Sequence, residues 1–161
     1  MRLLFIGMAS VLMCMGCQKN NVLNAVDWVM EHNYWVSGDE KSFTLTAGDT
    51  SKVYAMEITL AHDVSYPYQN LYIKTNTVFP SGKEVESVTS IELMRNDGAW
   101  AGDCRGQTCH ISMPLQERFT FPEIGTYTWS VEPYMRIDTV PGIHYFEVVV
   151  LEVADQPTVA E

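Results

Sequence analysis

The sequence predicts an all-β fold, an antiparallel β-sandwich of about eight or nine strands. Between residues 42 and 153 apolar and polar residues alternate with period two, which is typical of strands that bury one face. Turn-forming residues interrupt this alternation at regular intervals, as they do in sandwiches and barrels. No helical period follows residue 36, and the chain has no internal repeat.

The first strands are expected over residues 42–46, 53–60 and 70–79. A Gly-Asp-Thr-Ser turn separates the first two strands. In the third strand Leu71 and Ile73 alternate with polar neighbours, so one face of this strand is expected to be buried.

The second half of the chain continues the pattern. A Pro-Ser-Gly-Lys turn at 80–83 combines a preset φ with a residue that tolerates positive φ. An Asn-Asp-Gly hairpin signal at 96–98 ends the strand that follows this turn. The strands expected in this half cover residues 85–94, 99–101, 109–115, 125–135 and 143–153. The apolar run at 146–151 indicates a central strand.

The N-terminus predicts export and lipid attachment. The apolar run after Arg2 ends at Cys17, short of the roughly 20 residues of a membrane span, which indicates a signal peptide. Gly16 before Cys17 resembles a bacterial lipobox, in which the cysteine is acylated and the peptide is cut before it. Cys14 stands where that pattern usually has leucine. The alternative is an ordinary secretory peptide with incidental cysteines.

Four segments are therefore expected along the chain. They are a signal peptide (1–16), a lipidated tether (17–36), the β-sandwich (37–154) and a flexible tail (155–161). The tether segment is compatible with either a short amphipathic helix or an extended chain. An acyl group such as palmitate on Cys17 would gain about 0.8 kcal/mol for each buried methylene.

The composition argues against nucleic acid as a partner. The chain has 20 Asp+Glu against 10 Lys+Arg, a formal net charge of −10, and no basic cluster. Such a domain is repelled by nucleic acid and by anionic headgroups.

Cys104 and Cys109 predict a disulfide, because an even cysteine count is typical of oxidising compartments. Two sharper alternatives are a haem site, since His110 follows Cys109, and a zinc site. The four residues between the cysteines argue against haem, and zinc lacks an evident fourth ligand. We therefore expect no metal and no cofactor.

The candidate interaction surface comprises Tyr66, Tyr68, Asn70, Trp100 and Arg136. A proline between the two tyrosines stiffens a loop that, with Trp100, could stack on a sugar. Alternatively, one tyrosine caps the core, the other covers its edge, and Asn70 bonds a nearby turn backbone. Arg136 is a candidate either for an ion pair with Asp138 or for contact with a partner.

Two further patterns bear on structure and catalysis. Gly-Thr-Tyr ending at Tyr127 predicts a tyrosine corner, in which the phenol hydroxyl bonds a loop backbone. The four histidines are scattered, and no hydrolase, nucleotide-binding or zinc-protease motif is present. We expect no catalytic residues and no enzymatic activity.

Several segments together resemble the GldH family of gliding-motility lipoproteins. They fall between Trp35 and about Val150, and the cysteine-containing loop after Trp100 departs from the family's Gly/Ser-rich pattern. The matching segments are His62-Asp-Val-Ser-Tyr66-Pro-Tyr68-Gln-Asn70-Leu-Tyr72, the spacing of Trp35, Asp39 and Phe43, Phe79-Pro-Ser-Gly-Lys83, Phe121-Pro-Glu-Ile-Gly-Thr-Tyr-Thr-Trp129, Met135-Arg136 and Pro141-Gly-Ile143.

The resemblance implies an envelope lipoprotein that accompanies the gliding machinery of Bacteroidota, which is linked to protein secretion. It implies no enzymatic activity. We expect a membrane-anchored accessory component that faces the periplasm and contacts envelope proteins of that machinery. The alternatives are a glycan- or peptide-binding sandwich, favoured if Tyr66, Tyr68 and Trp100 are exposed, and an envelope hydrolase, favoured by a catalytic pair in a cleft.

Overall fold

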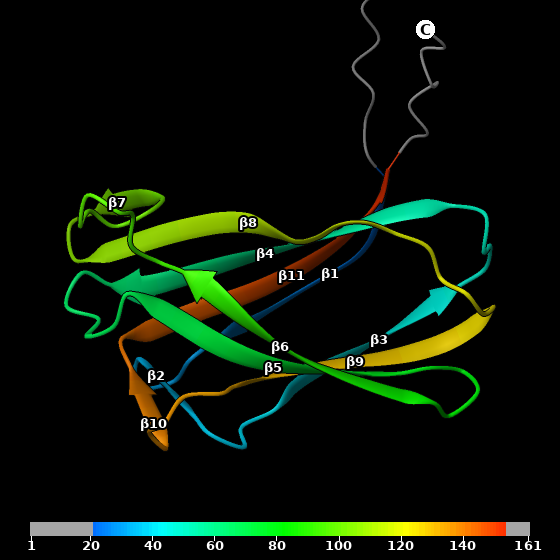
Figure 1. Ribbon diagram of the computed structural model, residues 1–161, viewed down its shortest axis with the longest axis horizontal. Helices are drawn as coiled ribbons and strands as arrows, with labels where there is room; N and C mark the ends of the chain where they lie inside the picture. The colour runs from blue at the N-terminus through cyan, green and yellow to red at the C-terminus, as the bar shows by residue number, and fades with distance from the viewer. Residues whose placement is uncertain (1–20, 154–161) are drawn as a thin grey trace, which may run out of the picture.

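Residues 21–153 of the computed structural model form eleven strands and no helix (Figure 1). The predicted all-β class is confirmed. The strands are β1 (Asn21–Val29), β2 (Tyr34–Val36), β3 (Lys41–Ala47), β4 (Val53–Asp63), β5 (Asn70–Val78), β6 (Glu84–Glu92), β7 (Asp103–Arg105), β8 (Thr108–Phe119), β9 (Gly125–Pro133), β10 (Thr139–Pro141) and β11 (Ile143–Val153).

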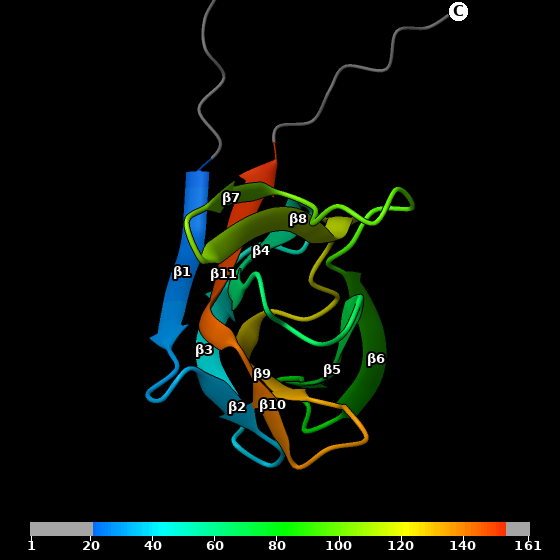
Figure 2. The same ribbon diagram turned by 90° about the vertical axis from the view of Figure 1, so that its left-hand side faces the viewer.

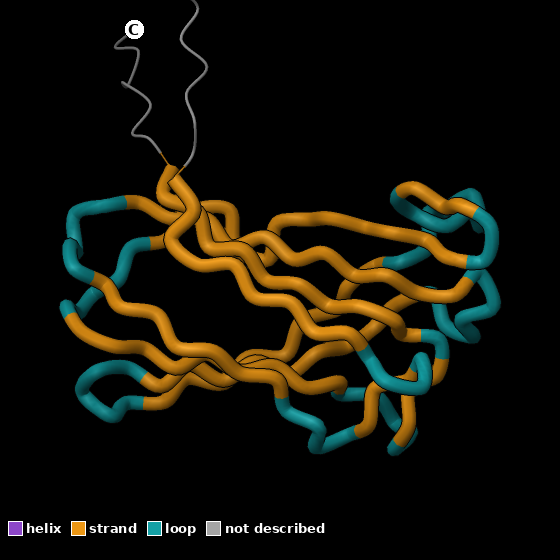
Figure 3. Tube along the Cα trace, turned by 180° about the vertical axis from the view of Figure 1, so that it is seen from behind, coloured by secondary structure: helices purple, strands orange, loops and turns teal. Residues whose placement is uncertain are grey.

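Two antiparallel sheets face each other in this arrangement (Figures 1 and 3). The first sheet has the order β1-β11-β4-β8-β7, and the second has the order β3-β9-β5-β6. A separate ribbon pairs β10 with β2. β11 has a hydrogen-bonded neighbour on each side, as expected for the apolar run that it contains.

The core lies between the sheets and follows from the period-two pattern. In β3 the buried residues Phe43 and Leu45 alternate with exposed threonines and serine, and in β11 Phe146, Val148 and Val150 are buried. Each of these three β11 side chains is at most 1% exposed. Burying a large apolar side chain contributes about 1.5–3 kcal/mol, so the inward rows of both sheets stabilise the fold.

The expectation of a tether or helix up to residue 36 is wrong for residues 21–36. Residues 21–29 form β1, which pairs antiparallel with β11 from Asn21↔Glu152 to Val29↔Tyr145. The period-two signal is present but weak, because β1 is an edge strand whose inward residues are only half-buried. Residues 1–20 and 154–161 lie outside the described part, so the predictions of a signal peptide, a lipidated Cys17 and a flexible tail remain untested by the structure.

Three further differences concern short or irregular pairing. The strand count exceeds the prediction because β2, β7 and β10 have only three residues each. The strand expected at 99–101 is reduced to one bridge between Met94 and Trp100. β8 continues to Phe119 rather than ending at residue 115, with register irregularities opposite Tyr54 and Met56.

The strand register fixes which loops share an end of the sandwich. Asn21 and Val153 lie together at one end, where β1, β11 and the start of β4 meet. At the other end, called the distal end here, the loops 30–33, 64–69 and 134–142 lie beside the ribbon and β7 (Figure 1). The chain therefore leaves the described domain at the end opposite the distal loops.

The predicted tyrosine corner is confirmed. Tyr127 is 2% exposed, and its hydroxyl donates to the Glu123 carbonyl at 2.9 Å and accepts from the Glu123 N–H at 3.0 Å. One phenol oxygen thus satisfies both polar groups of a loop backbone.

Tyr127→Phe is expected to destabilise the domain by about 1–3 kcal/mol, because it leaves the two Glu123 backbone groups without their partner. The free energy of unfolding in urea measures this. Tyr34→Phe is the matched control, since that tyrosine is 39% exposed. Equal stability of both variants would contradict the role of the corner.

Candidate functional site

Of the two tyrosines predicted from the sequence, Tyr66 is buried at the distal end and Tyr68 is half-buried beside it. Tyr66 is 4% exposed, and its hydroxyl donates to the Asn70 carbonyl at 3.1 Å. Burial raises the pKa of Tyr66 far above its usual range, so this hydroxyl stays a donor. Tyr68 packs edge-on against Tyr66 with ring centroids 5.6 Å apart and is half-buried. Tyr66 is therefore withdrawn from solvent.

Trp100 and Asn70 also make internal contacts. The Trp100 indole N–H donates to the Val64 carbonyl at 3.2 Å. The Asn70 side-chain amide donates to the Ser90 hydroxyl at 2.8 Å, across β5 and β6, rather than to a turn backbone as predicted. Tyr66, Trp100 and Asn70 thus hold the distal loops together, and they do not form an exposed aromatic cluster.

Arg136 is different, because its side chain is exposed. The predicted ion pair with Asp138 does not form, and within residues 21–153 no hydrogen bond or ion pair reaches the Arg136 guanidinium. Other cations in the same range pair with carboxylates, among them Lys41 with Asp39, Lys52 with Glu152 and Arg95 with Asp97. In a chain of net charge −10, this leaves an uncommitted positive charge at the surface.

Arg136 lies at an apolar hollow of about 690 Å³, called the distal groove here. Three of its residues are large and well exposed, namely Tyr134 at 57%, Val88 at 50% and Tyr72 at 43%. The lining residues are Tyr68, Tyr72, Val88, Tyr134, Met135, Arg136 and Ile137. The groove brings together two sequence-predicted residues, Tyr68 and Arg136, and leaves Tyr66, Asn70 and Trp100 outside its lining.

Strand pairing builds this groove. β5 lies between β9 and β6, so Tyr72 of β5 has the end of β9 on one side and Ser90 of β6 on the other. The Tyr134 N–H donates to the Tyr72 carbonyl at 2.8 Å, and the Tyr72 N–H donates to the Met135 sulfur at 3.4 Å. Two outward tyrosines are thereby fixed side by side. Tyr72 and Tyr134 were not among the site residues predicted from the sequence. The available signal was a large aromatic side chain at an outward-facing position, Tyr72 within β5 and Tyr134 directly after β9.

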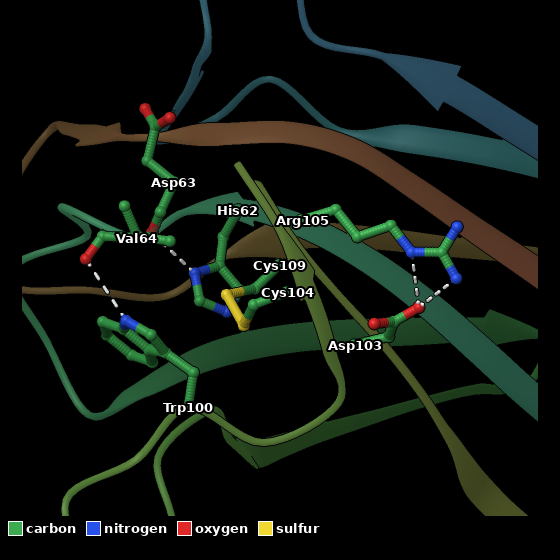
Figure 4. Close-up of a disulfide and its surroundings, with 8 residues drawn as sticks. All are labelled: His62, Asp63, Val64, Trp100, Asp103, Cys104, Arg105 and Cys109. Carbon is green, nitrogen blue, oxygen red and sulfur yellow. Dashed lines mark hydrogen bonds and ion pairs between the residues drawn. A yellow bond between two sulfur atoms is a disulfide. The ribbon is translucent and has the colours of Figure 1, made fainter. Parts of the chain in front are cut away.

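A buried histidine occupies the centre of the distal end. His62 is 0% exposed, lies opposite Cys109 in the register, and has the Trp100 ring 4.7 Å away (Figure 4). Its Nδ1 is 2.9 Å from the Asp63 carbonyl, which only accepts, so Nδ1 carries the proton. Its buried Nε2 has no hydrogen-bond partner within the described range. Burial lowers the pKa of His62, because protonating Nε2 would create an unpaired charge.

Stability is expected to fall with acidity because of His62. The folded pKa lies below the ordinary 6.5, so the unfolded chain takes up the proton first. This contribution is complete above pH about 6.5 and is lost as pH falls toward the folded pKa, with a slope of at most about 1.4 kcal/mol per pH unit.

Urea unfolding between pH about 5 and 8 tests this dependence on His62. The ionisable groups that face the ring are Asp63, His110 and His144. His62→Gln should flatten the slope, whereas His110→Gln, at an exposed position of β8, should retain it. An identical slope in wild type and His62→Gln would contradict the prediction.

The predicted disulfide between Cys104 and Cys109 is confirmed and joins β7 to β8 (Figure 4). Both sulfurs are committed to this bond, so they are not thiolate ligands for zinc or attachment points for haem. Within residues 21–153 no group of three or more His, Cys, Asp or Glu side chains is arranged to hold a metal ion.

Cys104→Ser with Cys109→Ser is expected to cost about 2 kcal/mol, because the closed loop is short and its entropy in the unfolded chain is small. The effect should concentrate on β7, which has three residues and pairs only with β8. Amide hydrogen exchange measures this, with accelerated exchange expected in β7 and unchanged exchange in β11. Faster amide exchange throughout the domain would show that the disulfide stabilises the fold by more than the loop-entropy estimate allows.

One acid–histidine pair lies near the distal end. Asp63 Oδ1 is 2.9 Å from His144 Nε2, and the Asp63 N–H donates to the Gly142 carbonyl at 2.8 Å. Gly142 has φ +74°, and a Cβ there would lie 3.2 Å from the Asp63 side chain, which explains the Pro-Gly step. A nucleophilic triad would need a hydroxyl or thiol on the histidine, and within the described part of the chain no such hydrogen bond to His144 is formed.

A second apolar hollow of about 260 Å³, called the inner groove here, lies between the sheets toward the end where the chain termini meet. Phe79, Val85, Phe121 and Trp129 are among its lining residues. Val85, on β6, is 44% exposed at its mouth.

Comparison with known proteins gives a consistent family assignment. The GldH lipoprotein family matches residues 27–148. A gliding motility lipoprotein GldH homolog of Christiangramia forsetii is 27% identical over 144 residues, which cover 89% of this chain and 87% of the relative. Together these matches span β1 to β11.

Solved structures are similar only in outline. A Yersinia pseudotuberculosis-derived mitogen aligns with a TM-score of 0.35 at 6% identity, covering 84% of this chain and 92% of that one. The infectious bursal disease virus Gx strain aligns with a TM-score of 0.36 at 13% identity, covering 87% of this chain and 34% of that one. Likenesses this weak carry no functional conclusion. Across the described range no helix is long and apolar enough to cross a bilayer.

Proposed function

Because the chain belongs to the GldH lipoprotein family, we propose that it is a non-enzymatic, membrane-anchored accessory component of the gliding machinery and of the protein secretion linked to it. In this role it binds an envelope protein and performs no chemistry. The family and the gliding-motility relative support the setting. The distal groove supports the mode of action.

The proposed anchor is the lipid on Cys17, exposed once residues 1–16 are removed. Cys17 precedes Asn21, the first residue of β1, by only four positions, so the linker can reach at most about 14 Å. It joins the domain at the end opposite the distal loops. The anchor would keep that end near the membrane and leave the distal groove free to meet partners in the periplasm. Tethering raises the local concentration, so modest contacts suffice.

The distal groove is the observation that carries this proposal. Tyrosine and arginine are among the residue types that dominate binding energy at protein interfaces. Tyr72, Tyr134 and Arg136 provide this combination on one surface. The expected partner surface offers apolar side chains for the groove and a carboxylate for the guanidinium.

A glycan ligand is the second candidate function, favoured by the two exposed tyrosines, which could stack on sugar rings. Val88, Met135 and Ile137 argue for a protein, because these aliphatic side chains offer a sugar no hydrogen bonds. Tyr66 and Trp100 are occupied by internal hydrogen bonds.

Affinity purification of the native protein from membranes in mild detergent tests the proposal, with Cys17→Ala as the control. Recovery of gliding or secretion proteins with wild type, and their loss with Cys17→Ala, is the expected result. If no such protein is recovered and polysaccharide is retained instead, the glycan alternative replaces this proposal.

A further inference from the structure

β6 is a long sheet edge that no strand within residues 21–153 covers. β1 and β3 are edges of opposite sheets, but they meet, since the Asn24 amide donates to the Thr44 carbonyl at 3.1 Å and Trp28 packs against Phe43. β7 has three residues and pairs with β8 only from Thr108 to His110, so the rest of β8 is a second open edge. That edge contains Pro114, which has no N–H to offer an added strand, and its pairing with β4 is irregular. β6 has nine residues, pairs only with β5 among the described strands, and lies on the side opposite β1 and β3 (Figure 2).

The hydrogen bonds of β5 show which backbone N–H and C=O groups of β6 point toward β5 and which point away from it. The Tyr72 carbonyl accepts from Tyr134 and the Tyr72 N–H donates to Met135, so the backbone polar groups of Tyr72 face β9. Backbone direction alternates along an antiparallel strand, so Ile73 and Thr75 face β6. The Thr75 hydroxyl accordingly donates to the Ser87 carbonyl at 3.4 Å.

The intervening residues of β6 therefore point their backbone groups away from β5. These residues are Glu86, Val88 and Ser90, and their N–H and C=O groups face the free edge. An unpaired edge of this kind is a template for a strand from another chain.

Apolar hollows flank this edge on both faces of the sheet. Val88 lines the distal groove on the outer face, and Val85 lines the inner groove between the sheets. The two valines are 50% and 44% exposed. Successive side chains of an added strand point to alternate faces. Such a strand would therefore place apolar side chains beside both valines.

The acidic side chains of β6 favour an added strand that carries positive charge. Glu84, Glu86 and Glu92 all lie on the outer face of β6, because they share parity with Val88. Opposite charges in directly facing strand positions are favourable, and like charges are not. The charge of the whole chain, −10, draws in a basic segment in the same sense.

We propose that β6 accepts an extended basic segment of a partner protein as an added strand, with lysine or arginine facing the glutamates and apolar residues facing the valines. The inference deepens the proposed function and rests on it for the existence of a partner protein. A second copy of this chain is disfavoured as the occupant, because pairing β6 with β6 brings the glutamates of the two copies together.

Titration of the purified protein with synthetic peptides tests this inference in the absence of gliding and secretion proteins. The probes are two capped peptides that alternate valine with lysine or with glutamate. The lysine peptide is expected to bind at least tenfold more tightly than the glutamate peptide. It should slow amide hydrogen exchange at Glu86, Val88 and Ser90. No binding, equal binding of both peptides, or binding without this protection would overturn the proposal.

Matched variants separate the backbone from the charge. Glu86→Pro removes the outward N–H without touching a bond to β5, and should bind the lysine peptide at least tenfold more weakly than Glu86→Ala. Glu84→Lys with Glu86→Lys should reverse the peptide preference, which keeps the test decisive if the proline variant folds poorly. Light scattering measures whether the purified protein forms dimers. Dimers in wild type that are lost in Glu86→Pro would show that a second copy, rather than a partner protein, occupies β6. Failure of the peptide test would overturn the inference about β6 alone. The proposed function is tested separately, by the affinity purification from membranes.

Discussion

Trp35→Ala is expected to destabilise the domain by about 3–5 kcal/mol, the range for removing a fully buried large aromatic. Trp35 is 0% exposed, and its ring lies 5.1 Å from that of Phe146 on β11. Its indole N–H donates to the Asp39 carbonyl at 2.8 Å. The change thus opens a cavity between the ribbon and the first sheet and leaves a loop carbonyl without its donor.

Urea unfolding measures this loss, and the neighbour Tyr34→Ala is the control, because Tyr34 is 39% exposed on the same strand. Since domains are stable by about 5–15 kcal/mol, Trp35→Ala should bring the protein close to unfolding while the control changes little. A loss below about 1 kcal/mol in Trp35→Ala would mean that β2 is not part of the cooperative core.

The combination of Tyr72→Ala, Tyr134→Ala and Arg136→Glu is expected to reduce recovery of the partner protein at least tenfold. The two truncations remove exposed aromatic surface, and the charge reversal repels the partner carboxylate that the arginine is expected to meet. The three side chains protrude from the surface, and no side-chain hydrogen bond of theirs holds the fold. Stability should therefore change little.

Affinity purification from membranes, with recovery measured by quantitative mass spectrometry, checks this prediction. Arg95→Glu and Tyr34→Ala are the matched controls, because both residues are exposed and lie outside the groove. Unchanged recovery with the triple variant would remove the groove from the proposed function, and equal loss with the controls would point to general charge or stability effects.

Much of the fold was predictable because it depends on local patterns. The alternation around Phe43, Leu71 and Phe146 gave strands within a few residues of β3, β5 and β11. The tyrosine corner was predictable for the same reason, since Tyr127 and Glu123 are four residues apart. The disulfide joins cysteines five residues apart and also follows from local sequence.

The features that the sequence did not predict depend on pairing between segments that are distant in the chain. β1 was missed because its strand pattern becomes evident only against β11, more than a hundred residues away. The distal groove combines Tyr72 and Tyr134, which only the β5–β9 register brings together. For the two tyrosines the sequence left two interpretations open, and the structure agrees with the one in which one tyrosine, Tyr66, caps the core and the other, Tyr68, covers its edge. Burial of His62 could not be predicted, because the motif is equally compatible with an exposed loop.

The central claim is that the distal groove of the anchored domain contacts a protein of the gliding or secretion machinery. Photocrosslinking in intact cells tests it most directly, with a photoreactive phenylalanine analogue at Tyr134 and, as the control, at Tyr34. We expect a covalent adduct with a gliding or secretion protein from position 134 that is absent from position 34. Adducts only to polysaccharide, only to a second copy, or to the same proteins from both positions would contradict it.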